Sequence, residues 1–176
     1  MTRVLLVGLM AVGKSTVCQA VAAATGWPAL DNDALLERST GSTAAELLAE
    51  QGVERLRAAE SDVLTLLLAM PGPFVAGVAA GTILDPRDRA RMRAGAHVVW
   101  LKAAVSTLAR RAAKQGGRAW LDQDPATVLR AMAEEREPLY AETAHQVLDM
   151  DRLTPAQAAR EVLTALRPPG GGQAPS

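Results

Sequence analysis

The sequence has few of the features that mark disulfide-stabilised, nucleic-acid-binding or membrane proteins. Its single cysteine, Cys18, excludes an internal disulfide and a zinc site built from cysteines. Its 19 lysines and arginines are balanced by 19 aspartates and glutamates, so it lacks the basic excess of a nucleic-acid-binding protein. The longest apolar stretch, residues 63–70, is too short to span a bilayer. No signal peptide is recognisable, so we expect a cytoplasmic protein without nucleic-acid or membrane partners.

The composition that remains is that of a folded domain. Of the 176 residues, 49% are apolar and 22% are charged, which is typical of globular proteins. This length is enough for one domain with a substantial core, and the sequence shows no internal repeat. Residues 168–176 are rich in proline and glycine. We therefore expect a single domain over residues 1–167, followed by a disordered tail.

Residues 8–15 read GLMAVGKS, which is the G-x-x-x-x-G-K-S pattern of a phosphate-binding loop. An apolar strand-like run precedes it and a helix-forming stretch follows it, so the loop would present unpaired backbone N–H groups and a helix dipole to an anion. Gly8 and Gly13 allow the tight backbone, Lys14 can reach the β- and γ-phosphates, and the Ser15 hydroxyl can ligate Mg²⁺. A chance match in a glycine-rich turn is the alternative, but the flanking elements favour a nucleoside triphosphate site.

Strand-like and helix-like segments alternate along the chain, which indicates an α/β protein with a parallel sheet. We expect strands at residues 4–7, 29–30, 74–78, 97–101 and 147–150. We expect helices at residues 14–24, 33–37, 43–50, 53–70, 86–94, 105–113, 125–143 and 155–166. Three helices have a clear start signal, because a capping residue precedes proline at Asp85-Pro86, Asp124-Pro125 and Thr154-Pro155.

Two carboxylates, Asp31 and Asp33, follow the second expected strand. Ligands of parallel sheets bind at the carboxyl ends of the strands. One carboxylate could hold Mg²⁺ and the other could orient or deprotonate an attacking hydroxyl. The alternative is that Asp33 only caps the next helix.

Several arginines stand out because guanidinium groups suit a bidentate grip on carboxylate or phosphate. Arg57 lies three residues before Glu60, Arg136 precedes an E-P-L-Y sequence, and Arg118 lies in a glycine-containing segment, residues 114–124, that we expect to be a lid. For Arg118, neutralising charge during phosphoryl transfer is the favoured role. A solvated helix face is the plainer interpretation for Arg110, Arg111 and Arg130.

Taken in order and spacing, these motifs resemble those of the shikimate kinase family. They comprise GLMAVGKST at residues 8–16, DND at 31–33, R-x-x-E at 57–60, Arg118, and R-E-P-L-Y at 136–140. The resemblance extends over about residues 4–166. It implies a P-loop three-layer α/β/α sandwich with a five-stranded parallel sheet in the order 2-3-1-4-5. It also implies a monomer that phosphorylates shikimate with ATP as co-substrate and Mg²⁺ as cofactor.

The resemblance also assigns residues to roles. Catalysis would fall to Lys14, Asp33 and Arg118, and the metal would lie near Ser15 and Asp31. ATP would be bound by Ala11, Val12, Gly13, Lys14, Ser15, Thr16, Arg110, Arg118, Arg152 and Pro155, with Arg110 and Pro155 against the adenine. The acceptor would be bound by Asp33, Arg57, Glu60, Ala80, Gly81 and Arg136, with the two arginines on its carboxylate and Glu60 holding Arg57.

The chain departs from the family pattern at a few positions. Three consecutive glycines usually follow the third strand, whereas this chain has Ala79-Ala80-Gly81. If Ala80 needed a positive φ, alanine would cost roughly 1–2 kcal/mol. Ala11 also replaces a common glycine, Leu153 replaces a common ATP-contacting arginine whose place Arg152 could partly take, and Trp120 replaces a smaller lid residue. Another small-metabolite kinase such as a gluconate kinase, or a nucleotide-binding paralogue with reduced activity, therefore remains an alternative.

Overall fold

The computed structural model describes residues 2–115 and 124–167. Within them, five parallel strands form one sheet in the order β2-β3-β1-β4-β5, which confirms the expected topology. The strands are β1 (Arg3–Val7), β2 (Ala29–Leu30), β3 (Phe74–Gly77), β4 (His97–Lys102) and β5 (Gln146–Asp149). The helices are α1 (Lys14–Thr25), α2 (Asn32–Thr40), α3 (Ala44–Ala69), α4 (Pro86–Gly95), α5 (Val105–Gln115), α6 (Pro125–Thr143) and α7 (Pro155–Ala165), together with the short 3₁₀ helix η1 (Thr82–Leu84).

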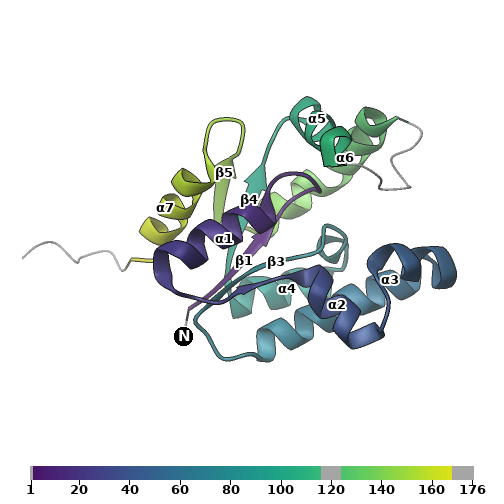
Figure 1. Ribbon diagram of the computed structural model, residues 1–176, viewed down its shortest axis with the longest axis horizontal. Helices are drawn as coiled ribbons and strands as arrows, with labels where there is room; N and C mark the ends of the chain where they lie inside the picture. Colours follow the sequence, from purple (N-terminus) through teal and green to yellow (C-terminus); the bar gives the residue numbers. More distant parts are fainter. Residues whose placement is uncertain (1, 116–123, 168–176) are drawn as a thin grey trace, which may run out of the picture.

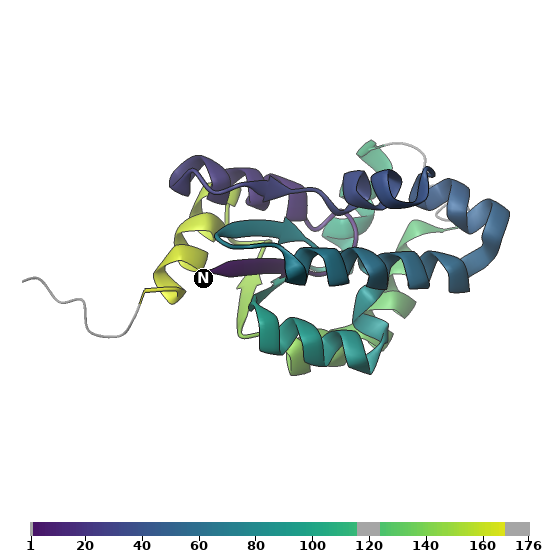
Figure 2. The ribbon, with the colours of Figure 1, turned by 90° about the horizontal axis from the view of Figure 1, so that it is seen from below.

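The central strand β1 explains the position of the core. Leu5 pairs with Ala76 of β3 on one side and with Val98 of β4 on the other. Helices cover both faces of the sheet, so an apolar run without alternation suits this strand. α1 and α7 pack together on one face, whereas α4 and α6 pack on the other (Figures 1 and 2). Cys18 lies in this core, where burial raises its thiol pKa to about 12 and makes it unreactive.

The helix starts expected from the sequence are present. The side chains of Asp85, Asp124 and Thr154 cap α4, α6 and α7, each followed by a proline in the first turn. The two expected helices at 43–50 and 53–70 form the single element α3, which is interrupted at Gly52 (φ 81°, ψ 174°). The turn η1 was not expected, because its short apolar sequence carries no periodicity.

Some expectations concern residues outside the described ranges. These are the proposed lid loop with Arg118 and Trp120, of which residues 116–123 are not described, and the tail at residues 168–176. Among the helices of residues 2–115 and 124–167, none combines the length and apolar character needed to cross a membrane.

Candidate active site

The site lies at the edge of the sheet where the parallel strands end. The phosphate loop, residues 8–13, follows β1; Asp31 follows β2; and Ala79, Ala80 and Gly81 follow β3. This arrangement places α2 and α3 on one side of the loop and α5 and α6 on the other (Figure 1). Segments far apart in the sequence therefore meet at the usual ligand-binding edge of an α/β sheet.

The phosphate loop depends on its glycines. Gly8 has a φ of 143°, and a Cβ there would lie 2.5 Å from the carbonyl oxygen of Leu101. Gly13 has a φ of 104° and forms the N-cap of α1. The Lys14 Nζ donates to the carbonyl oxygens of Gly8 (2.8 Å) and Leu9 (3.1 Å), so the ammonium lies over the loop. A cation and a helix N-terminus thus face the same concavity, which suits polyphosphate binding.

Backbone strain in the site falls on Ala11 rather than on Ala80. Ala11 has a φ of 59°, and among the described residues it is the only non-glycine with a positive φ. Ala80 does not have the positive φ that would have strained an alanine there. A left-handed conformation costs an alanine roughly 1–2 kcal/mol, so the strain is stored in the phosphate loop.

The two aspartates after β2 have different local roles. Asp31 is the N-cap of α2, where its Oδ1 accepts from the backbone N–H groups of Asp33 (2.8 Å) and Ala34 (3.2 Å). The alternative that Asp33 serves as the cap is therefore wrong. Asp33 lies exposed in the first helical turn, and its negative charge contributes to the raised pKa of Glu60. Asp33 thus lies within electrostatic range of Glu60, one of the groups expected to bind the acceptor.

Those groups form what we call the acceptor cluster: Arg57, Glu60, Ala80, Gly81 and Arg136. Arg57 Nη1 donates to Glu60 Oε2 at 2.6 Å, and Arg136 Nη1 donates to the carbonyl oxygen of Ala80 at 3.1 Å. A Cβ on Gly81 would overlap Arg57 Nη1 and Cζ and lie 2.5 Å from Glu60 Oε2. The structure therefore brings together both arginines, although they lie on α3 and α6.

Burial dominates the electrostatics of the acceptor cluster. Glu60 is 6% exposed, and this burial raises its pKa, while the positive charges of Arg57 and Arg136 oppose the rise. Arg136 is 5% exposed and also lies 3.2 Å from Glu135 Oε2. The buried Arg136 guanidinium therefore attracts an anion more strongly than an exposed one does, whereas the Arg57 side chain is 32% exposed.

The remaining predicted nucleotide residues are more exposed. Arg110 lies exposed on α5, Pro155 begins α7, and Arg152 has a side chain 85% exposed with its Nε 3.3 Å from Asp149 Oδ2. Ser15 and Thr16 are exposed at the start of α1.

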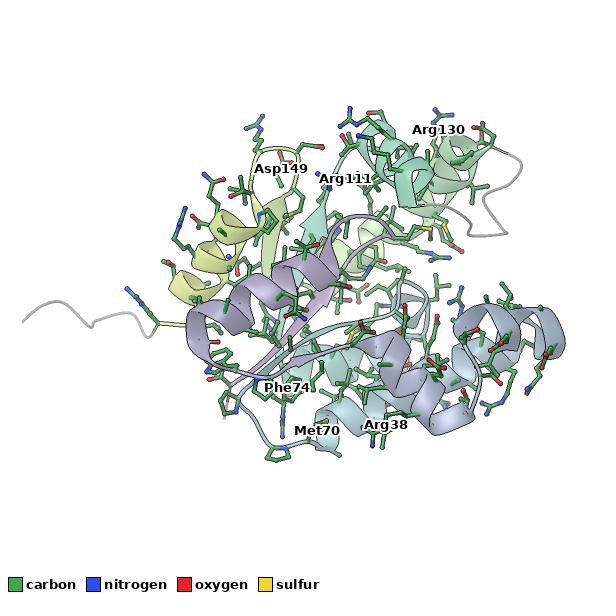
Figure 3. The ribbon with its side chains drawn as sticks, viewed as in Figure 1. Arg38, Met70, Phe74, Arg111, Arg130 and Asp149 are labelled. Carbon is green, nitrogen blue, oxygen red and sulfur yellow. The ribbon has the colours of Figure 1, made fainter. Side chains whose placement is uncertain are left out.

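Sequence reasoning missed two contributions. Arg111 is not on a merely solvated face, because its Nη1 donates to the carbonyl oxygen of Val12 (3.3 Å) and its Nη2 to that of Met150 (3.2 Å); Figure 3 contrasts it with Arg130 on the outer side of α6. Tyr140 donates its hydroxyl to the Ala80 carbonyl oxygen at 3.3 Å. The sequence could have indicated a role for Tyr140, because residues four apart on a helix share a face and Tyr140 lies four residues after Arg136.

A strand–loop–helix phosphate site beside two arginines, of which Arg136 is buried and Arg57 partly buried, defines a P-loop phosphotransferase that acts on small anionic acceptors. Comparison with known proteins identifies the family within this class. The sequence profile of the family described as "SKI: Shikimate kinase" matches residues 10–167. The chain is 40% identical to the shikimate kinase of Caulobacter vibrioides over 166 residues, covering 93% of this chain and 82% of that protein. It is 38% identical to shikimate kinase 2 of Sodalis glossinidius, covering 93% and 94%. The chain belongs to the shikimate kinase family.

Solved structures agree with this assignment. Shikimate kinase from Acinetobacter baumannii in complex with shikimate superposes with a TM-score of 0.88 at 28% identity, covering 94% of this chain and 93% of that one. A gluconokinase from Sinorhizobium meliloti superposes with a TM-score of 0.65 at 22% identity, covering 94% and 91%. The second likeness is one of fold alone.

Proposed function

We propose that this protein transfers the γ-phosphoryl group of ATP to a hydroxyl of shikimate, giving shikimate 3-phosphate. The observation that carries the proposal is the acceptor cluster, in which guanidinium groups from α3 and α6 approach the same peptide, that of residues 80–81. Shikimate bears a carboxylate and several hydroxyls, so it offers one group to the guanidinium pair and another to Asp33.

On the nucleotide side, the proposed roles follow the geometry of the phosphate loop. Backbone N–H groups of residues 11–16 would hold the phosphates, and Lys14 would stabilise the charge that builds up during transfer. Arg110 and Pro155 would contact the adenine, with Arg152 nearby. Arg118, outside the described residues, is proposed to neutralise the transferring phosphoryl group.

A magnesium ion fits the donor set at this edge. The Ser15 hydroxyl and the Asp31 carboxylate are hard oxygen donors. Among the described residues, no group of three or more His, Cys, Asp or Glu side chains could hold a metal by itself, so the phosphates and water would have to complete the coordination. Mg²⁺ keeps several waters and takes phosphate oxygens as ligands, so two protein groups suffice. When bound, the ion would supply charge neutralisation at the phosphates.

On the acceptor side, the main role of the protein would be to orient the substrate. Arg57 and Arg136 would bind the carboxylate, and the 2.6 Å contact with Glu60 would fix the Arg57 guanidinium. Asp33 would then accept a hydrogen bond from the attacking hydroxyl and take its proton as the bond to phosphorus forms. We further propose that residues 1–167 act as one domain and as a monomer.

A comparison of acceptors tests the function. ATP turnover would be measured with shikimate, quinate and gluconate, and the product identified by phosphorus NMR. We expect kcat/KM for shikimate to exceed that for gluconate by at least about a hundredfold. The shikimate ring fixes its hydroxyls relative to its carboxylate, whereas the open chain of gluconate does not, and a misplacement of about 1 Å can cost about a hundredfold. Faster turnover of gluconate, or no acceptor-dependent turnover, would overturn the proposal.

A further inference from the structure

The carbonyl oxygen of Ala80 accepts hydrogen bonds from two donors on one helix face. Arg136 Nη1 lies 3.1 Å from it and the Tyr140 hydroxyl lies 3.3 Å from it. Both donors belong to α6, one turn apart, while Ala80 lies in the turn between β3 and η1. This shared acceptor links the tyrosine to the acceptor cluster without placing it against the acceptor itself.

The Tyr140 ring is held rigidly. It is 1% exposed and stacks on Trp100 of β4, with ring centroids 5.8 Å apart and planes 25° apart. The Lys102 ammonium lies 5.0 Å from the Trp100 centroid and 2.8 Å from Glu137 Oε2, which ties the stack to α6. Burial raises the pKa of Tyr140 above its usual range, so its hydroxyl stays protonated and donates at neutral pH.

The neighbouring peptide makes the position of Ala80 important for Arg57 as well. Gly81 leaves just enough room for the Arg57 guanidinium, because a Cβ at this position would overlap it. A shift of the residue 80–81 peptide would therefore change the space available to Arg57 as well as the partner of Arg136. Through its hydrogen bond to the Ala80 carbonyl oxygen, Tyr140 therefore influences the positions of both Arg57 and Arg136.

Arg136 also faces two demands once an acceptor binds. Its guanidinium has five N–H donors, but turning it toward the acceptor carboxylate would weaken its 3.1 Å bond to the Ala80 carbonyl oxygen, which still needs a donor. A partly buried carbonyl oxygen that loses its donor destabilises the turn that contains it. The Tyr140 hydroxyl removes this conflict, because it can hold the carbonyl while Arg136 engages the acceptor.

We propose that Tyr140 is a positioning residue for the phosphoryl acceptor, holding the residue 80–81 peptide in place while Arg136 binds the carboxylate. The inference rests on the proposed function, since it requires a carboxylate-bearing acceptor at the cluster. It predicts that the hydroxyl matters for acceptor binding and little for ATP.

Tyr140→Phe tests this, because phenylalanine keeps the ring and its stack on Trp100. We expect KM and Kd for shikimate to rise about fivefold to tenfold, as loss of one hydrogen bond of about 1 kcal/mol or slightly more would give. KM for ATP should stay within twofold. Steady-state kinetics in both substrates and calorimetric titration of shikimate without nucleotide provide the readouts.

Thr143→Val is the matched control. Thr143 is 1% exposed on the same helix, and its hydroxyl donates to the Leu139 carbonyl oxygen at 2.7 Å, away from the acceptor cluster. This variant should leave KM for shikimate unchanged. If Tyr140→Phe leaves shikimate KM and Kd unchanged, or raises KM for ATP equally, the inference is overturned. A wild-type protein that neither binds nor phosphorylates shikimate would overturn the proposed function, and this inference with it.

Discussion

The phosphate loop and the acceptor cluster are neighbours in space but are built in opposite ways. The loop is one contiguous stretch whose lysine bonds carbonyls five and six residues away, and it stores strain at Ala11. The acceptor cluster joins α3, the turn after β3 and α6, with hydrogen bonds across 56 and 60 residues. Nucleotide binding is therefore encoded locally, whereas acceptor binding depends on how the whole fold packs.

The largest effect should come from removing the single cation of the phosphate loop. Lys14→Ala should lower kcat by at least about a hundredfold, because loss of one group aimed at developing charge costs about 2.7 kcal/mol or more. Arg160→Ala, which removes an exposed cation from α7, is the control and should be neutral. Single-turnover measurement of phosphoryl transfer separates this from weaker ATP binding. More than a tenth of wild-type kcat would contradict a catalytic role for Lys14.

In the acceptor cluster, the sharpest change is Gly81→Ala. The added Cβ would overlap the Arg57 guanidinium and lie 2.5 Å from Glu60 Oε2, so Arg57 would have to move away from its 2.6 Å bond with the buried Glu60. We therefore expect KM for shikimate to rise about tenfold or more, roughly 1.4 kcal/mol, with KM for ATP nearly unchanged. We also expect a lower Tm, because the buried Glu60 loses its partner.

Gly95→Ala provides the matched control. Its Cβ would lie 2.8 Å from the Leu68 side chain, so it also introduces a close contact, but in the α3–α4 packing. This variant should lower Tm and leave both KM values alone. If Gly81→Ala kept wild-type KM for shikimate, the Arg57 position would not matter for the acceptor.

The same contrast decides what could be predicted from sequence. The strand order, the phosphate loop and the caps at Asp85, Asp124 and Thr154 could be anticipated because each depends on local sequence or on a family pattern. The hydrogen bonds of Arg111 could not be anticipated, because the carbonyl oxygens of Val12 and Met150 that accept them lie 99 and 39 residues away in the sequence. An arginine on a helix looks solvated until the fold determines which carbonyls face it.

The departures from the family pattern illustrate this limit further. At the replaced glycines after β3 a positive φ would have strained an alanine, yet neither Ala79 nor Ala80 has a positive φ. The replaced glycine in the loop, Ala11, does have one. The backbone conformation of an alanine is set by the turn around it. The presence of alanine in place of glycine therefore could not show which of the two sites is strained.

A moderate effect on stability should follow from relieving the loop strain. Ala11→Gly removes a left-handed alanine costing roughly 1–2 kcal/mol, against roughly 0.5–1 kcal/mol of added chain entropy on unfolding. We expect a net gain of about 0.5–1 kcal/mol, or a Tm rise of about 1–4 °C. Ala24→Gly, in an exposed position of α1, should instead destabilise by about 1 kcal/mol. Calorimetry of the two variants should show opposite signs, and a lower Tm for Ala11→Gly would contradict strain at that residue.

The smallest effect should come from restoring the family glycines with Ala79→Gly/Ala80→Gly. Neither alanine occupies the left-handed region, and Ala80 contributes to the cluster through its backbone carbonyl, which glycine retains. The double variant should therefore change kcat/KM for shikimate by less than about threefold, under 0.7 kcal/mol. Its Tm should fall slightly, because glycine adds unfolded-state entropy. A tenfold gain in kcat/KM would show instead that the alanine methyl groups obstruct the acceptor, and the contrast between a strained loop and an unstrained acceptor cluster would then fail as an account of function.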